Sequence, residues 1–162
     1  MVPDLRGEDA FTEWVAPHWA AMTHLASRLC GRPIGEDVLQ EALTTAWRKR
    51  AQFDPQRGSA RNRLLALTAD QARKAHRRST RRAESQLIDL PITSPAANRD
   101  IDIDHAIRRL SDRQKLAIDL YYFLGLPVAD VARVMRCAEG TVKSTLSDAR
   151  ERLRHDLGED FE

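Results

Sequence analysis

Cysteine is scarce in this chain: Cys30 and Cys137 are the only two among 162 residues, and they lie far apart without the spacing of metal ligands. We interpret them as buried thiols in a reducing compartment, with a redox switch as the alternative. The five histidines form no pair with metal-ligand spacing, and the sequence contains no glycine-rich phosphate loop or nucleophile motif. These absences argue against an enzyme and predict neither a metal ion nor a cofactor.

Long apolar runs are missing as well. No stretch approaches the roughly 20 apolar residues of a membrane span, and the first residues, MVPDLRGEDAF, lack the basic-then-apolar pattern of a signal peptide. We therefore expect a cytoplasmic protein that does not insert into membranes. Alternating runs of β-branched residues are also lacking, so no sheet is predicted. With 42% hydrophobic and 31% charged residues, the chain is expected to be a soluble all-α protein.

Apolar residues recur at helical spacing in most of the chain. Residues 11–29 predict one helical face, on which Trp14 and Trp19 are expected to be core residues, as is Trp47 further along the chain. Residues 35–50 predict a second helix, whose polar residues lie off its apolar stripe. The N-terminal half is therefore predicted to form a helical bundle.

Charge is unevenly distributed, although the net charge is only +2. A turn, FDPQRGS (53–59), precedes a third helix with Ser59 as its predicted N-cap, and this helix is expected to end in the basic block RKAHRRSTRR (73–82). The basic block has six Lys or Arg residues and no acid, whereas residues 84–104 contain five acids and a single base. This asymmetry indicates a polyanionic partner; the alternative is a solvated helix end.

Residues 84–103 predict a flexible linker, because they contain two prolines, few large side chains and no sustained period. A tether of about twenty residues can extend to roughly 65–70 Å, so the flanking parts can be held apart or can fold back on each other. We therefore predict two small helical domains, residues 1–83 and 104–162.

The C-terminal domain begins with a capping-box pattern. Ser111 and Gln114 have the S-x-x-Q spacing in which each side chain bonds the backbone of the other residue. They precede a predicted helix in which Leu116, Leu120 and Phe123 are expected to face inward. The pattern therefore predicts a well-defined helix start at this point of the chain.

Two further apolar stripes, over residues 128–135 and 142–153, are separated by a break at 136–140 that contains a glycine. They predict a short helix, a tight turn and a longer helix whose apolar faces meet, as in a helix-turn-helix unit. The outer side of the longer helix carries small polar residues first and bases further along, which suits the DNA major groove. The alternative is an all-α bundle whose basic residues only keep it soluble.

Several motifs resemble those of bacterial sigma factors of the sigma-70 family. EGTVKSTLSDARERLR (139–154) resembles the recognition helix of region 4, and LSDRQKLAIDLYYFLGLPVADVARVM (110–135) resembles the helices before it. IGEDVLQEALTTAWRKRAQFDPQRGSARNRLLALTADQARKAHRR (34–78) resembles region 2. A short chain with these two regions in this order, joined only by a linker, is similar to the extracytoplasmic-function group.

The resemblance implies a promoter-specificity subunit that binds core RNA polymerase, recognises promoter DNA and directs transcription initiation. It also implies an anti-sigma factor as a partner. In the family, region 2 docks on the clamp helices of the β′ subunit, and region 4 meets the β flap. The implied polymerase-binding residues here are Asp37, Gln40, Glu41, Thr44 and Arg48.

The resemblance also implies two sets of DNA-binding residues. Region 2 would capture the minus-ten element through the loop 54–59 and the start of the next helix, and its basic block would follow phosphate, which is sequence-independent work. These residues are Arg61, Asn62, Arg63, Arg73, Lys74, Arg77 and Arg78. Region 4 would bind the minus-thirty-five element through Glu139, Thr141, Lys143, Ser144, Ser147, Arg150 and Arg154.

The chain departs from the family pattern in region 2. The family often has an aromatic residue near Ala60 and a tryptophan near Arg63, and commonly Arg-Asn where this chain has Ala69 and Asp70. Capture of single-stranded DNA generally combines aromatic stacking with positive charge. These departures therefore bear on which bases are recognised and on promoter melting.

Two other functions are considered beside the sigma factor. A helix-turn-helix regulator of the LuxR type has a similar Gly-Thr-Val-Lys helix, but is usually preceded by a receiver or sensor domain that residues 34–59 do not resemble. A helical adaptor without a nucleic-acid role is the other alternative, against which the basic block argues.

Overall fold

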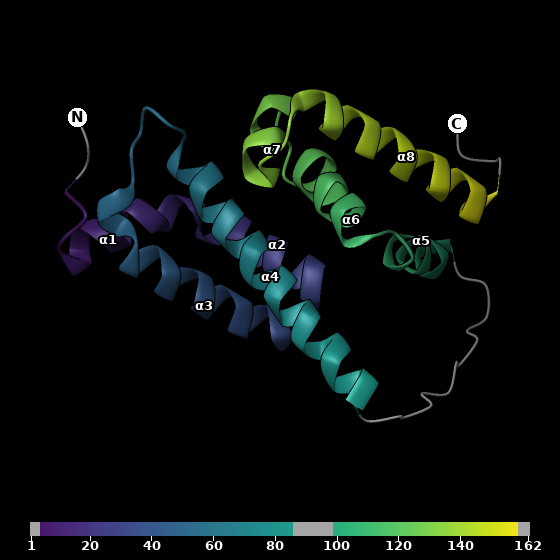
Figure 1. The fold of residues 1–162 in the computed structure, drawn as a ribbon, viewed down its shortest axis with the longest axis horizontal. Helices are drawn as coiled ribbons and strands as arrows, with labels where there is room; N and C mark the ends of the chain where they lie inside the picture. Colours follow the sequence, from purple (N-terminus) through teal and green to yellow (C-terminus); the bar gives the residue numbers. More distant parts are fainter. Residues whose placement is uncertain (1–3, 86–98, 159–162) are drawn as a thin grey trace.

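The computed structural model describes residues 4–85 and 99–158, and all regular secondary structure in these two ranges is helical (Figure 1). This confirms the predicted all-α fold class. The N-terminal group consists of α1 (Glu8–Val15), the 3-10 turn η1 (Ala16–His18), α2 (Trp19–Cys30), α3 (Ile34–Arg48), the 3-10 turn η2 (Arg50–Gln52) and α4 (Ala60–Ser85). The C-terminal group consists of α5 (Arg99–Arg108), α6 (Asp112–Ile118), the π-helical turn η3 (Asp119–Phe123), α7 (Val128–Met135) and α8 (Glu139–Leu157).

The structure describes only the two ends of the predicted linker, residues 84–85 and 99–103. Residues 86–98 lie outside the described residues. Helix α5 begins at Arg99, so the helical part of the C-terminal group starts before residue 104, where the sequence predicts it. The predicted flexibility of the linker stays a prediction.

A proline divides the first predicted helix. Pro17 lies in η1, between α1 and α2, because a proline inside a helix removes a backbone hydrogen bond and clashes with the preceding turn. The single helical face predicted for residues 11–29 is therefore interrupted. Trp19 follows the break and is 49% exposed, so its assignment to the core is wrong. Trp14 and Trp47 are partly buried, and both contact the ring of Phe11.

The predicted pattern of α3 and the predicted start of α4 are confirmed. Val38 and Ala42 of α3 are 3% and 0% exposed, as the apolar stripe requires. The hydroxyl of Ser59 accepts a hydrogen bond from the backbone N–H of Asn62 at 3.1 Å, as an N-cap does. Helix α4 continues to Ser85, so the basic block is part of the helix and does not end it.

The start of α6 has both hydrogen bonds of a capping box, between Ser111 and Gln114. The helix then widens into the π-helical turn η3, in which the N–H of Leu124 bonds the carbonyl of Asp119. The extra residue in this turn rotates the following side chains away from the α-helical pattern. Leu120 is fully buried as predicted, but Phe123 is 47% exposed, so its predicted inward position is wrong.

Helices α7 and α8 form the predicted helix-turn-helix unit. Val131 of α7 and Val142 of α8 are both 0% exposed. The chain reverses at Arg136, which ends α7 in the left-handed conformation with φ of 52°. Gly140 lies within the first turn of α8, which begins at Glu139, so the glycine is not the turn residue that the sequence pattern indicates.

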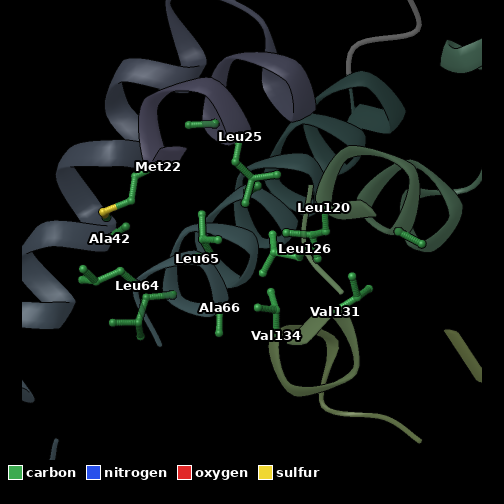
Figure 2. Packing of buried hydrophobic residues seen from close by; sticks show 14 of the residues in the cluster. Met22, Leu25, Ala42, Leu64, Leu65, Ala66, Leu120, Leu126, Val131 and Val134 are labelled. Carbon is green, nitrogen blue, oxygen red and sulfur yellow. The ribbon is translucent and has the colours of Figure 1, made fainter. Parts of the chain in front are cut away.

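The two groups of helices pack against each other and share one continuous apolar core (Figure 2). Helix α4 contacts α2 and α3 of its own group and α7 of the C-terminal group. Leu65 and Ala66 of α4 belong to the same buried cluster as Leu126 and Val134. The chain therefore adopts the folded-back arrangement, which is one of the two that the length of the linker permits.

The capping box leads to a prediction about stability. Replacing Ser111 with alanine leaves the backbone N–H of Gln114 without its acceptor and should lower the free energy of unfolding by about 0.5–2 kcal/mol. Ser79 is exposed in α4 and makes no side-chain hydrogen bond among the described residues, so Ser79→Ala is the matched control and should be neutral or slightly stabilising. Urea unfolding measures both; equal midpoints for the two variants would contradict the role of the cap.

Candidate polymerase and nucleic-acid interfaces

The outer face of α3 carries the residues predicted to bind polymerase. Its polar side chains are all exposed: Asp37, Gln40, Glu41, Thr44 and Arg48. A hollow of about 610 Å³ lies between α3 and the C-terminal part of α4. Its walls include Asp37 and Glu41 from α3 and Arg78 and Arg82 from α4, and the 45% exposed side chain of Ile34 lies at one end. A mixed apolar and charged surface of this kind suits a protein partner.

The outer face of α8 is open to solvent along its whole length. The predicted DNA-contacting residues on it are all exposed: Glu139, Thr141, Lys143, Ser144, Ser147, Arg150 and Arg154. Val142, Leu146 and Ala149 face the core instead and are at most 4% exposed. The buried stripe fixes the rotation of the helix, so the polar and basic face is presented outward as a unit.

The second half of α4 presents the basic block to solvent. Arg73, Lys74, Arg77 and Arg78 are exposed. Arg73 forms an ion pair of 3.1 Å with Asp70 one turn earlier. The block is therefore a basic surface on a continuous helix, which suits phosphate contacts without base recognition.

The remaining predicted minus-ten residues, at the start of α4, have a different environment. Asn62 is only 6% exposed, and its Nδ2 donates a hydrogen bond to Oδ1 of Asp130 in α7 at 2.8 Å. Arg61 donates through Nη2 to the backbone carbonyl of Leu124 at 3.0 Å. The structure thus brings these two residues together with the C-terminal group, a contact that the sequence did not predict.

A hollow of about 420 Å³ lies beside the loop 54–59. The loop and Arg63 form one side of it, and Arg133 and Arg136 of the C-terminal group form the other. Burial, and secondly the positive charge of Arg136, lower the pKa of Arg63. Positive charge is therefore concentrated where the two groups of helices meet.

A buried ion pair connects α2 to η3. Nε of Arg28 donates to Oδ1 of Asp119 at 2.6 Å, and Asp119 is 3% exposed. Burial raises the pKa of Asp119, while the hydrogen bond and the charge of Arg28 act in the opposite direction. The guanidinium carbon of Arg28 also lies 3.3 Å from the ring centre of Phe123, a cation–π contact. An acid within the apolar run LAIDLYYF was the available sequence signal for a buried partner.

A second ion pair between the two groups uses a residue at which the chain departs from its family pattern. Asp70 of α4 lies 3.1 Å from Nη2 of Arg136, through the carboxylate oxygen that does not face Arg73. Ala69, the preceding departure, is 3% exposed and lines the same cavity as Met135 of α7. Both departures therefore lie where α4 meets the C-terminal group.

The two cysteines are half-buried and unpaired. Burial, and secondly the charge of Asp112, raise the pKa of the Cys30 thiol, so this thiol is less readily ionised than an ordinary cysteine. In residues 4–85 and 99–158, no group of three or more His, Cys, Asp or Glu residues is arranged to hold a metal ion. None of the helices in these ranges is both long enough and apolar enough to cross a membrane.

Two family models match the chain in the predicted order. The model "Sigma-70 region 2" matches residues 14–82, and the model "Sigma-70, region 4" matches residues 100–153. The ECF RNA polymerase sigma factor SigK of Mycolicibacterium vanbaalenii is 30% identical, over 94% of this chain and 84% of its own length. The ECF RNA polymerase sigma factor SigM of Mycobacterium tuberculosis is 32% identical, over 83% of this chain and 71% of its own length.

Solved structures show the same fold. The sigma factor RpoE of Bartonella quintana, in complex with the anti-sigma factor NepR, is 26% identical and matches with a TM-score of 0.75, covering 93% of this chain and 98% of its own. CnrH, in complex with the cytosolic domain of CnrY, is 21% identical with a TM-score of 0.70, over 96% of this chain and 92% of its own. The second likeness bears on the fold alone.

Proposed function

Because the chain belongs to the extracytoplasmic-function group of the sigma-70 family, whose members are promoter-specificity subunits of RNA polymerase, we propose how its surfaces divide that work. Region 2 (residues 1–83) binds core polymerase and the minus-ten element, and region 4 (residues 104–162) binds the minus-thirty-five element. Residues 84–103 join them. The observation that carries this division is the pair of exposed polar faces, on α3 and on α8, each over a buried apolar stripe.

The face of α3 is the polymerase-binding surface in this proposal. Its two acids, Asp37 and Glu41, lie one helical turn apart and are exposed to a basic or amide-rich partner surface. The adjoining hollow and Ile34 supply apolar area next to the charges. The partner surface is the clamp-helix region of the β′ subunit, and region 4 meets the β flap.

The outer face of α8 recognises bases. Lys143, Ser144 and Ser147 lie in its first turns, where a recognition helix reaches base edges in the major groove. Arg150 and Arg154 lie further along, where the helix runs beside phosphate. Glu139 and Thr141, in the first turn, complete the surface.

Region 2 captures the minus-ten element with the loop 54–59 and with Arg61, Asn62 and Arg63. The exposed bases Arg73, Lys74, Arg77 and Arg78 hold the phosphate backbone by charge. Since stacking residues are lacking near Ala60 and Arg63, base recognition here depends mainly on hydrogen bonds and positive charge, and not on the aromatic platforms that single-strand binders generally use.

An anti-sigma factor is a partner of this protein in the same proposal. Its support is the likeness to RpoE of Bartonella quintana, whose structure was solved in complex with the anti-sigma factor NepR. The match to that structure covers 93% of this chain. The proposed location is the cytoplasm, where core polymerase and promoter DNA are found. The LuxR-type alternative leaves the match of residues 14–82 to region 2 unexplained, and a helical adaptor leaves both matches unexplained.

Run-off transcription tests the function directly. Core polymerase with this protein should produce discrete transcripts from a subset of a promoter library, and core polymerase alone should not. Equal patterns with and without the protein would contradict the proposal.

The polymerase-binding face generates one prediction. Reversing the charges of Asp37 and Glu41 to lysine should weaken binding to core polymerase at least tenfold, because charge pairs across an interface become repulsive contacts. Helicity should be unchanged, since both side chains are exposed. Glu13, also exposed on α1, provides the control Glu13→Lys. Co-purification of the double variant at the wild-type level would show that this face does not bind polymerase.

The outer face of α8 leads to a prediction about base recognition. In the holoenzyme, Lys143→Ala or Ser147→Ala should cost on the order of 1–3 kcal/mol and change the preferred upstream sequence. Arg154→Ala should weaken binding to all sequences about equally and reduce the slope of binding against salt by about one. Binding to matched and scrambled upstream elements measures both effects. If Lys143→Ala and Arg154→Ala behave identically on the two elements, α8 does not recognise bases.

A further inference from the structure

The proposed DNA-binding and polymerase-binding surfaces are not equally accessible in the folded-back chain. The faces of α3 and α8 are exposed throughout. By contrast, Asn62 is 6% exposed, and Arg61 and Arg63 are partly buried beneath the C-terminal group. Of the proposed minus-ten residues, the three at the start of α4 are therefore covered by the chain's own region 4, while the basic block further along α4 and the faces of α3 and α8 remain open.

The covering is made by specific polar contacts. Asp130 and the carbonyl of Leu124 accept hydrogen bonds from the side chains of Asn62 and Arg61, at 2.8 Å and 3.0 Å. These are the groups that the proposed function assigns to DNA. A nucleic acid strand has to replace region 4 as their hydrogen-bonding partner, because a buried amide such as that of Asn62 cannot make both sets of contacts at once.

The contact with region 4 also explains Asp70 and Ala69, two residues that are not suited to binding DNA. Asp70 places a negative charge on the DNA-facing helix α4, yet it forms an ion pair with Arg136 of region 4 at 3.1 Å. Ala69 beside it is small and buried, which lets α7 approach α4 closely. Both residues are explained by contact with region 4.

Charge also opposes the closed arrangement. Arg63 and Arg136 line the same hollow, and burial, and secondly the charge of Arg136, lower the pKa of Arg63; the repulsion between the two guanidinium groups favours opening. The ion pair between Arg28 and Asp119 opposes opening at another point of the interface. Its N–O distance is 2.6 Å, and Asp119 is almost fully buried. Removing one partner of such a pair leaves a buried charge without compensation and is strongly unfavourable.

We propose that region 4 is an intramolecular cap on the minus-ten site of region 2 in the free protein, and that the Arg28–Asp119 ion pair holds the cap closed. The proposal rests on the assignment of Arg61, Asn62 and Arg63 to DNA. Since the polymerase-binding face of α3 is exposed in the capped form, the capped protein can meet core polymerase. Arg61, Asn62 and Arg63 contact single-stranded DNA only after region 4 has moved away.

The test opens the cap without changing a proposed binding residue. Arg28→Glu places two carboxylates against each other, and Asp130→Ala removes the acceptor of Asn62 independently. Arg108→Glu is the control: it makes the same charge change on α5, where Arg108 is exposed and has no ion pair within the described chain. Small-angle X-ray scattering gives the radius of gyration of each full-length variant, and a fluorescent pool of random single-stranded DNA reports access to the site.

Arg28→Glu should increase the radius of gyration and raise the affinity for the DNA pool on the order of tenfold or more, because apparent affinity scales with the fraction of open molecules. Asp130→Ala should act in the same direction and Arg108→Glu should match the wild type. Adding Arg61→Ala and Arg63→Ala to Arg28→Glu should abolish the gain. An unchanged radius, an open chain without a gain in affinity, or a gain that survives these two substitutions would overturn the cap.

Failure of the proposed function would be seen separately. Holoenzyme formed with saturating Arg28→Glu should transcribe as the wild-type holoenzyme does, because the cap is already displaced there. Absence of run-off transcription by wild-type holoenzyme would contradict the sigma-factor assignment of these surfaces, whatever the scattering of the free chain shows.

Discussion

Helix α4 has to satisfy two packing partners at the same time, and the arrangement of the protein follows from this constraint. Leu64 and Leu65, both fully buried, join the core formed with α2 and α3, while the adjoining positions Ala66 and Ala69 are small enough for α7 to lie against the same helix. Only the second half of α4 is left to solvent, and there the sequence becomes basic. The polar residues at the start of the helix are consequently drawn into the contact between the two regions.

Periodicity of apolar residues was sufficient to predict most of the fold. Val38, Val131 and Val142 each belong to an apolar stripe on a different helix, and all three are buried, because local amphipathicity determines which face of a helix enters the core. It failed where the backbone departs from the α-helix. Pro17 interrupts the first helix before Trp19, and the π-helical turn displaces Phe123, so neither aromatic side chain enters the core and both are about half exposed.

Only those features of the candidate site that depend on a single helix could be predicted from the sequence. The polar faces of α3 and α8 are complementary to apolar stripes on the same helices, so their exposure could be inferred from the sequence, and their partners came from the resemblance to sigma factors. The partner of Asn62 could not be inferred, nor could the pairing of Arg28 with Asp119, since these residues are 91 positions apart. No local period contains information about such a contact; it arises only when the two regions pack together.

The proposed cap requires that the free chain is closed and that the polymerase-bound chain is open. Spin labels on His24 and Tyr122, both exposed near the contact between α2 and η3, allow the distance between the two regions to be measured by pulsed electron paramagnetic resonance. We expect one short, narrow distance distribution for the free protein and a long distance in the holoenzyme. A long distance in the free protein, or the same short distance in both states, would contradict it.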